Sequence, residues 1–440
     1  PSRGLGDVYK RQASNWIPSP SPTVGVPRPP VFCPLSSSRK RRCDDMTTMV
    51  PCRRVEMPQL FDHIPGSISL SGGLPDLSVL PSNQIAELTS RIMRLGSRIL
   101  LQYSTPSVSS SLVPAILDLA ERTCMSPDPR NLIPTAGSQL GLAMVINAFD
   151  GDEIICDCAT YPGALAAFAS AGVETTGVAS DEEGLNPDAL AHAVAEGRAN
   201  GRRIAAVYTT PTFQNPTGSV QSENRRAALL KVCADNDLLL IEDDPYGMLS
   251  FDGQTWPALK SMDPQRVIYL GTFSKVFAPG VRSGWIDPPA NLVEKLRAVC
   301  EIMTLSPSAL NQAIIGEYHR RHGWDELLEG YRASYRDRAR LLIGALEAEL
   351  ARTNCTGTWT WREPRGGFYL WLENVASTSG IDVARRAADN GVAVVPGKHF
   401  DAAGHDSPSL RVSFSNSRPA DLVEGARRLA RALVGEDVQK

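Results

Sequence analysis

The chain has 440 residues, of which 42% are hydrophobic and 21% charged, and this composition is typical of a globular protein with two or three domains. A formal net charge of −3 argues against a general binder of nucleic acid or membrane surfaces, and no apolar run approaches the roughly 20 residues that a membrane-spanning helix needs. The nine cysteines are scattered, without a Cys-x-x-Cys pair. We therefore expect reduced thiols, a cytoplasmic location and no metal, with a site at Cys156 and Cys158 as a minor alternative.

Residues 1–52 differ from the rest of the chain. They contain "PSPSPTVGVPRPP" and "SSSRKRRC", show no helical or strand periodicity, and begin without methionine. We expect a disordered extension that is not native coding sequence, with the true start at Met46 or Met49. A targeting or nucleic-acid-binding role for the basic residues 39–42 is the less favoured alternative.

From residue 130 onward, short apolar segments alternate with helical ones. Near-continuous Val, Ile and Leu runs predict buried strands within 152–160, 173–180, 203–213, 237–246 and 266–275. Between them we expect helices that start after the N-caps Asn186 and Ser222. This alternation predicts an α/β fold with a mostly parallel central sheet and helices on both faces.

After about residue 305 the pattern changes. A long polar helix across 320–350 leads to strand-like segments at 366–373 and 391–400, which predict a smaller α+β domain. We divide the chain into the extension 1–52, an N-terminal arm with part of the small domain at 53–105, a large domain at 106–305 and a C-terminal small domain at 306–440.

Polar residues follow several of these strands. Each alone has an ordinary explanation, such as a turn, a helix cap or a solvated lysine. Ligands in open α/β sheets bind at the carboxyl ends of strands. The order of these polar residues along the chain is the one expected if they all lie at the same edge of one sheet. Its members are Gly137, Ser138 and Gln139 before a helix, Asn215, Asp243, Tyr246 and Lys275.

The chain resembles the fold-type I, class I aminotransferases that use pyridoxal 5'-phosphate. Within them it is most similar to the group of 2-aminoadipate aminotransferases and the aminotransferase-like half of MocR regulators. The resemblance runs from about residue 64 to 433. It rests on "SGGLPD", "TAGSQLG", "TYPG", "QNPTG", "EDDPYG", "TFSKVFAPGVRSGW", "PRGGFYLW" and "LRVSF".

The resemblance implies three catalytic residues. Lys275 would form a Schiff base with the cofactor aldehyde and, once released, move the proton at the substrate Cα. Asp243, rather than Asp244, would face the pyridine nitrogen, because the Asp-x-x-Tyr spacing ends at Tyr246. Tyr246 and Asn215 would bond the phenolic oxygen of the cofactor.

The resemblance also assigns the remaining contacts. The phosphate would lie at the helix N-terminus against five residues. These are Ser138 and Gln139 through their amides, Thr272 and Ser274 through their hydroxyls, and Arg282 through its guanidinium. Tyr161 would stack on the ring. Tyr103 would reach the phosphate of a second subunit, which implies a homodimer. Arg411 and Asn215 would bind the substrate carboxylate, with Gly72 and Gly73 leaving room for the substrate. A cis Asn215–Pro216 bond is expected from the same family pattern.

One segment departs from the family pattern. Where the family commonly has "YGPTEGYPPLREAI", this chain has "YSTPSVSSSLVPAI", so Ser104, Val108 and Val113 replace two glycines and an arginine. Glycine reaches positive φ easily and valine does not, so we expect another loop path and narrower substrate use. "DCATYPG" also departs, because it replaces a family form that has an acid and a proline before Thr160 and Tyr161.

The expected function is transfer of an amino group from an amino acid to a 2-oxo acid by a ping-pong mechanism. Two alternatives remain open. One is a specialised enzyme on the same scaffold, such as a lyase, cyclase or oxidase. The other is a truncated MocR-type regulator, which would need an N-terminal DNA-binding pair of helices that residues 1–52 do not show.

Overall fold

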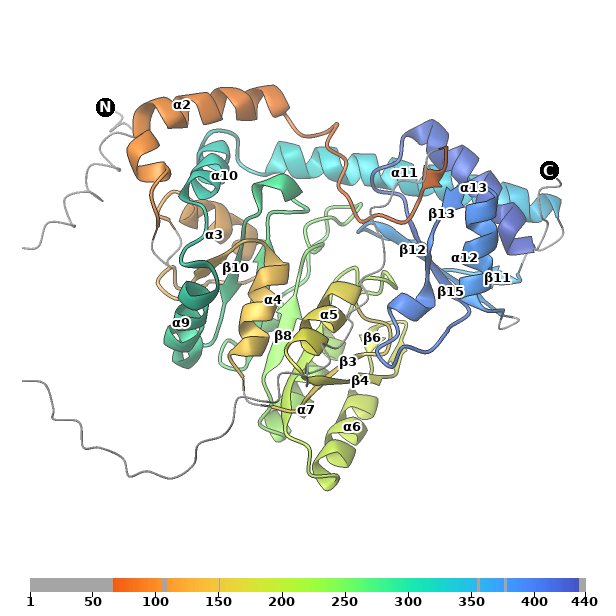
Figure 1. Ribbon diagram of the computed structural model, residues 1–440, viewed down its shortest axis with the longest axis horizontal. Helices are drawn as coiled ribbons and strands as arrows, with labels where there is room; N and C mark the ends of the chain where they lie inside the picture. Colours follow the sequence, from red (N-terminus) through yellow and green to blue (C-terminus); the bar gives the residue numbers. More distant parts are fainter. Residues whose placement is uncertain (1–65, 105–108, 150, 354–356, 376–377, 435–440) are drawn as a thin grey trace, which may run out of the picture.

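A seven-stranded sheet forms the centre of the larger part of the molecule (Figure 1). The structure, a computed structural model, describes residues 66–104, 109–149, 151–353, 357–375 and 378–434, so the expected extension at 1–52 lies outside it. In spatial order the strands are β2 (Ile133–Thr135), β10 (Gly284–Asp287), β9 (Val267–Thr272), β8 (Leu240–Asp243), β7 (Ile204–Thr209), β3 (Glu153–Asp157) and β4 (Glu174–Val178).

The sheet is mostly parallel, as the sequence predicts. Strands β4, β3, β7, β8 and β9 pair in parallel and correspond to the five predicted segments. Strand β10 runs antiparallel between β9 and β2. The apolar pattern does not predict β2 or β10, because they have only three and four residues.

Helices cover both faces of the sheet. Apolar side chains of α4 (Ser138–Asn147), α5 (Pro162–Ser170) and α9 (Val293–Thr304) fill one side, and those of α6 (Pro187–Ala199), α7 (Glu223–Asp235) and α8 (Leu259–Met262) fill the other. The prediction that segment 173–180 is a buried strand is wrong. In β4 only Val178 is buried, because β4 lies at the edge of the sheet and exposes Glu174 and Gly177.

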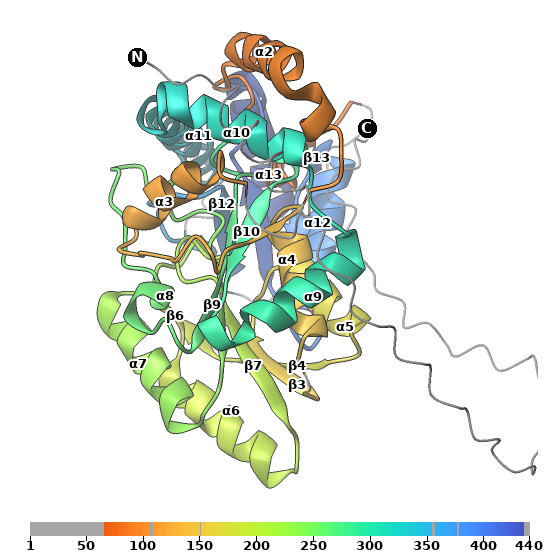
Figure 2. The ribbon, with the colours of Figure 1, turned by 90° about the vertical axis from the view of Figure 1, so that its left-hand side faces the viewer.

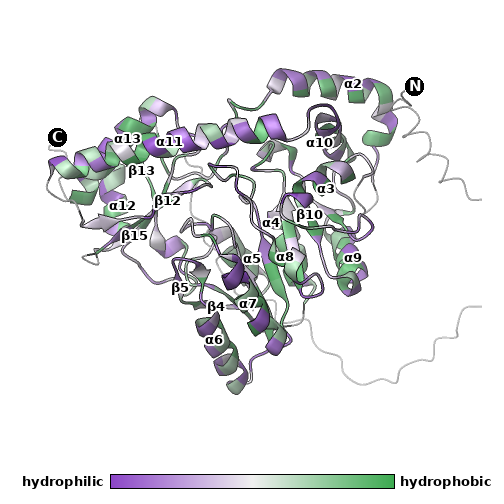
Figure 3. Ribbon diagram, turned by 180° about the vertical axis from the view of Figure 1, so that it is seen from behind, coloured by the Kyte–Doolittle hydropathy of each residue, from purple (hydrophilic) through white to green (hydrophobic). Residues whose placement is uncertain are grey.

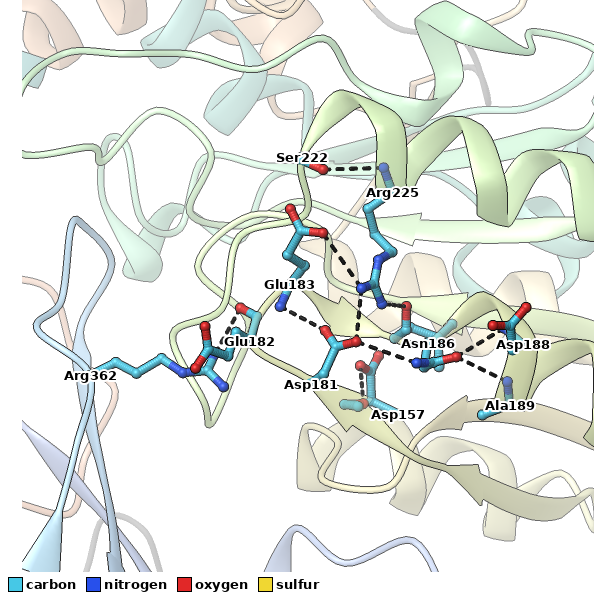
Figure 4. Close-up of polar contacts among 12 residues, drawn as sticks. Asp157, Asp181, Glu182, Glu183, Asn186, Asp188, Ala189, Ser222, Arg225 and Arg362 are labelled. Carbon is cyan, nitrogen blue, oxygen red and sulfur yellow. Dashed lines mark hydrogen bonds and ion pairs between the residues drawn. The ribbon is translucent and has the colours of Figure 1, made fainter.

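The predicted N-caps are present and lie beside a small hairpin (Figure 4). Asn186 Oδ1 accepts from the Asp188 and Ala189 amides at the start of α6, and Ser222 Oγ accepts from the Arg225 amide in α7. The hairpin joins β5 (Ser180–Asp181) and β6 (Gly184–Leu185). These contacts satisfy amides that a helix N-terminus otherwise leaves free.

A second, antiparallel sheet forms the smaller part. Its order is β11 (Trp359–Thr360), β12 (Tyr369–Asn374), β15 (Ser409–Ser413) and β14 (Val395–Pro396), and it is accompanied by α12 (Gly380–Asp389) and α13 (Pro419–Val434). The arm returns here, since β1 (Ile68–Ser69) pairs with β13 (Val392–Ala393). Arg362 also reaches across to donate to the Glu182 carbonyl at 2.7 Å (Figure 4).

Long helices join the two parts. In Figure 2, α2 (Ser82–Leu100), α10 (Ala309–His322) and α11 (Asp325–Arg352) lie together at the top, while α3 (Val113–Glu121) packs below on α10. Hydrophobic and hydrophilic residues alternate along α2 and α11, as expected for helices with one buried face (Figure 3). The prediction of one helix across 320–350 is wrong, because Gly323 takes φ 64° and separates α10 from α11.

The remaining elements are short. They are the 3-10 turns at Pro279–Val281, Ala290–Leu292 and Gly397–His399. The domain division proposed at 305 and 306 falls between α9 and α10. Because α11 packs against α13 and continues from the α10 region, it belongs to both parts of the molecule. No helix in the described part of the chain is long and apolar enough to cross a membrane.

Candidate active site

A cavity of about 400 Å³ lies at the carboxyl ends of the parallel strands. It gathers the site residues predicted from sequence, except Tyr103 and the two glycines Gly72 and Gly137, which do not line it. The lining residues in that set are Gly73, Ser138, Gln139, Tyr161, Asn215, Asp243, Tyr246, Thr272, Ser274, Lys275, Arg282 and Arg411. Tyr103, near the end of α2, is 77% exposed and does not line it.

Glu242 and Asp243 end β8, and Asp244 follows directly. These three consecutive carboxylates make different contacts. Glu242 accepts from the Leu259 and Lys260 amides and so caps α8. Asp244 accepts from the Gly247 amide at 2.9 Å and from Tyr269 Oη at 3.1 Å. Asp243 alone lines the cavity, which agrees with the choice of Asp243 over Asp244.

Asp243 has one occupied and one free oxygen. Tyr208 Oη donates to Asp243 Oδ2 at 2.8 Å, whereas Oδ1 is buried without a hydrogen-bond partner among the residues that the structure describes. Burial raises the pKa of Asp243 to about 7, against the opposing effects of the Tyr208 hydrogen bond and the Lys275 charge. An unpartnered buried oxygen is costly, so this site favours a ligand that donates a hydrogen bond.

Lys275 lies just beyond β9. Its Nζ donates to the Gly73 carbonyl at 2.7 Å and lies 5.5 Å from the centre of the Phe368 ring. Burial, reinforced by the positive charges of Arg411 and Arg282, lowers the pKa of Lys275 to about 8. The neutral fraction of the amine is therefore larger than that of an ordinary lysine, and only a neutral amine can attack a carbonyl.

One end of the cavity is suited to an anion. Ser138 begins α4, and Gly137 before it has φ 89°. A Cβ on Gly137 would lie only 2.7 Å from Arg282 Nη2, so glycine is required here for the guanidinium to approach the helix start. Arg282 Nη1 donates to Ser274 Oγ at 3.4 Å, and Thr272 Oγ1 bonds Ser274 Oγ at 3.0 Å. A helix N-terminus, hydroxyls and a guanidinium together match a phosphate group.

The roof of the cavity comes from the smaller part and the arm. Arg411 in β15 donates from Nη1 to Asn215 Oδ1 at 2.9 Å and from Nη2 to the Ser71 carbonyl at 2.6 Å. Its guanidinium lies between the rings of Tyr369 and Phe400, 4.2 and 4.8 Å from their centres. Arg411 lines the cavity, and within the described chain its buried Nε has no partner, so the guanidinium keeps a donor for a ligand.

Three aromatic side chains complete the walls. Tyr161 precedes α5, and burial raises its pKa to about 12. Tyr246 Oη lies 3.2 Å from Tyr369 Oη, and burial holds the pKa of Tyr246 well above its usual value. The predicted cis Asn215–Pro216 bond is present, and Asn215 lines the cavity.

Sequence reasoning missed two tyrosines of this site. Tyr208 lies inside a buried strand, where an aromatic residue looks like ordinary core. Tyr369 follows a Gly-Gly pair in "PRGGFYLW", and that motif was the available signal. The structure adds that a Cβ on Gly73 would lie 2.0 Å from Tyr369 Oη, so a larger residue at position 73 would collide with Tyr369 unless that ring moved.

The Cys-x-Cys pair is split between environments. Cys156 is buried in β3 and burial raises its pKa to about 12, whereas Cys158 is exposed. The described residues include no group of three or more His, Cys, Asp or Glu side chains placed to hold a metal ion.

Comparison with known proteins gives a consistent set of matches. The family described as aminotransferase class I and II matches residues 68–429. The aromatic-amino-acid aminotransferase 1 of Thermococcus litoralis is 33% identical over 376 residues, which cover 84% of this chain and 88% of the relative. The 2-aminoadipate transaminase of Thermus thermophilus is 32% identical over 377 residues, covering 84% and 91%. Among solved structures, the kynurenine aminotransferase of Pyrococcus horikoshii in complex with PMP has a TM-score of 0.79 at 30% identity, covering 84% and 91%.

Proposed function

Because this chain belongs to the class I and II aminotransferases, a pyridoxal-phosphate-dependent family, we propose that the cavity beneath Gly73 is its active site. The chain is an enzyme of that family, which moves amino groups between amino acids and 2-oxo acids by a ping-pong reaction. The roles of individual residues below are part of the proposal.

The residues present fit the cofactor at both of its ends. The unpartnered Oδ1 of Asp243 is placed to accept a hydrogen bond from a protonated ring nitrogen. At the other end, the α4 amides at Ser138 and Gln139, the Thr272 and Ser274 hydroxyls and Arg282 would hold the phosphate. The free carboxylate oxygen of Asp243 is the single observation that supports the proposal most strongly.

Lys275 supplies the reactive amine. When bound, the cofactor supplies an aldehyde that accepts the amino group and a ring that takes up electron density from the substrate Cα. Lys275 Nζ, whose lowered pKa increases its neutral fraction, would be the group that holds the cofactor aldehyde. The same nitrogen would be the base that takes the proton from the substrate Cα and later returns it.

The polar walls orient cofactor and substrate. Arg411 would bind the substrate carboxylate through its guanidinium. Asn215 and the rings of Tyr369 and Phe400 hold that guanidinium in place. Tyr246 and Asn215, which line the cavity, would donate hydrogen bonds to the phenolic oxygen of the cofactor, and Tyr161 would pack on its ring. Gly73 leaves the space through which the substrate side chain enters.

A second copy of the chain would complete the site. Tyr103 is exposed, as are the apolar residues Leu95, Ile99 and Leu101 just before it in the chain, and Ile302, Met303 and Leu305 are exposed at the end of α9. Ser104 joins these two clusters, because its amide donates to Ser306 Oγ at 3.0 Å and its hydroxyl to the Pro307 carbonyl at 2.8 Å. An apolar patch of this kind supports a homodimer in which Tyr103 reaches the partner's phosphate.

The altered segment from Ser104 to Val113 supports a restricted donor range. Its residues 105–108 lie outside the described chain. The hydroxyls of Ser109 and Ser111 form a hydrogen bond with each other, and the Ser109 amide donates to Gln312 Oε1. Val113 begins α3 where the family pattern carries an arginine. We expect slow reaction with glutamate and aromatic donors and faster reaction with a specialised amino acid.

Single-turnover spectroscopy of the purified holoenzyme against a panel of amino acids tests this proposal. The measured quantity is the rate at which each donor converts the bound cofactor to its amine form. Conversion by at least one amino acid supports the proposal. A protein that binds the cofactor and converts it with no donor would instead favour other chemistry on the same scaffold, and rapid conversion by many ordinary donors would show that the altered segment is neutral.

A further inference from the structure

The two carboxylates that follow each other in "EDDPY" are each held by one tyrosine from a neighbouring strand. Tyr208 on β7 donates to Asp243 at 2.8 Å, and Tyr269 on β9 donates to Asp244 at 3.1 Å. Strand β8 lies between β7 and β9 in the sheet. The two tyrosines therefore make similar contacts to two adjacent carboxylates, only one of which lines the cavity.

Tyr208 is held firmly. Tyr208 pairs with Ile241 in the β7–β8 register. Asp243 comes two residues after Ile241 on β8, so the side chains of Tyr208 and Asp243 project from the same face of the sheet. The ring is 1% exposed and packs edge-on against Phe168 of α5 at 5.4 Å between ring centres. Burial and the Asp243 charge raise the pKa of Tyr208 well above its usual value, so the phenol keeps its proton and acts as a donor.

We infer that Tyr208 is a positioning residue that fixes the Asp243 carboxylate so that its free oxygen, Oδ1, is presented to the cofactor. This inference rests on the proposed cofactor site. The terminal torsion of an aspartate is broad, so a carboxylate with no fixed partner can rotate. By bonding Oδ2, Tyr208 selects one orientation of Asp243, a residue that lines the cavity, and leaves Oδ1 without a partner and free to accept a hydrogen bond.

The same hydrogen bond affects the charge of Asp243. A donor to the ionised form favours that form, and the Tyr208 contact lowers the pKa of Asp243 against the effect of burial. The other groups that act on Asp243 are Asp244 beside it, which raises its pKa, and Lys275 beyond β9, which lowers it. Tyr161 at the start of α5 and Tyr269 on β9 also face this charge.

Tyr208→Phe is therefore expected to raise the pKa of Asp243 and release its orientation, with the ring contact to Phe168 kept. Below its pKa a neutral Asp243 cannot pair with a protonated ring nitrogen, so cofactor affinity should fall as the pH is lowered. We expect pyridoxal phosphate to bind about tenfold more weakly near pH 7, and the acidic limb of its binding profile to move up by about one pH unit.

Equilibrium binding of pyridoxal phosphate to the cofactor-free protein, followed from pH 5 to 9, is the test. The matched control is Tyr269→Phe, which removes the equivalent hydroxyl from Asp244 and should leave the profile unchanged. A Tyr208→Phe profile equal to wild type, or equal shifts in both variants, would overturn the inference. Wild-type protein that does not bind the cofactor would instead contradict the proposed function.

A double-mutant cycle separates positioning from a general structural effect. If Tyr208 acts through Asp243, Tyr208→Phe should weaken cofactor binding no further in an Asp243→Asn background. An additive loss there would contradict the inference. Should Tyr208→Phe fail to fold, Phe168→Leu frees the ring while keeping its hydroxyl, and a binding profile unchanged from wild type would likewise contradict it.

Discussion

The floor and the roof of the cavity are built in different ways. The floor consists of residues at or just beyond the ends of adjacent parallel strands, such as Asp243 and Lys275, and the sheet register fixes their spacing. The roof consists of Gly73, Tyr369 and Arg411, which come from the arm and from the smaller sheet. It depends on contacts across the molecule, such as Ser415 Oγ to the Leu74 carbonyl and the Arg338–Asp76 ion pair at 2.7 Å.

This difference assigns separate tasks to the two surfaces. A rigid floor suits groups that must face fixed atoms of a cofactor, whereas a roof from another part of the chain suits recognition of a substrate that enters and leaves. Changes in the floor should therefore alter cofactor chemistry and kcat. Changes in the roof should mainly alter KM for the amino acid.

Asp243→Asn should have the largest effect among these variants. An amide cannot neutralise a protonated ring nitrogen, so we expect kcat to fall by about a hundredfold or more. Asp244→Asn should leave kcat within a few-fold, because Asp244 bonds Gly247 and Tyr269 outside the cavity. Steady-state kinetics of the two holoenzymes make the comparison, and the opposite ranking would show that the wrong carboxylate has been assigned.

Arg411→Lys tests the roof. A lysine cannot offer a planar, two-pronged contact, so KM for the amino donor should rise by about tenfold to a hundredfold. Cofactor affinity should stay close to wild type. Arg338→Lys is the control. The ion pair of Arg338 with Asp76 lies outside the cavity, so this variant should raise KM much less. If cofactor affinity falls as much as substrate affinity in Arg411→Lys, floor and roof are not separate in function.

Tyr103→Ala tests whether the floor is completed by a second subunit. Loss of one hydrogen bond to the phosphate should weaken cofactor binding by about tenfold. Mixed dimers of Tyr103→Ala and Lys275→Ala chains contain one site with both residues intact. Activity regained on mixing the two variants is the expected result, and a mixture no more active than its separate components would place Tyr103 outside the partner's site.

The lowered pKa of Lys275 gives the smallest predicted effect, a shift in a pH profile. Capture of the cofactor requires the neutral amine, so its rate at fixed cofactor concentration should rise as pH increases and level off above about pH 8. Stopped-flow absorbance with the cofactor-free protein measures this rate. A rate that keeps rising towards pH 10 would mean that the amine is not desolvated as the structure indicates.

The sequence predicted members of both surfaces, Asp243 and Lys275 in the floor and Gly73 and Arg411 in the roof. Lys275 and Asp243 follow apolar strands, and the carboxyl ends of parallel strands meet at one edge, so local pattern and topology together place them. The caps Asn186 and Ser222 were likewise predictable, because capping depends on nearby residues. Local pattern does not reveal tertiary pairings, and so it missed the contacts of Tyr208 and Tyr369.

The wrong predictions have related causes. Segment 173–180 has strand composition, but whether a strand is buried depends on its place in the sheet, and β4 lies at the edge. Residues 320–350 have helical composition on both sides of Gly323, but one residue at positive φ ends α10. In both cases the composition was interpreted correctly and the three-dimensional context was not.

The central claim is that Lys275 carries the cofactor at the floor of this cavity. Borohydride reduction of the wild-type holoenzyme, followed by proteolysis and mass spectrometry, tests it most directly. We predict that the phosphopyridoxyl group is found on the peptide containing Lys275 and that Lys275→Ala protein retains no reducible attachment. A label on another lysine, such as Lys260 or Lys398, or a reducible link that persists in Lys275→Ala, would contradict the account.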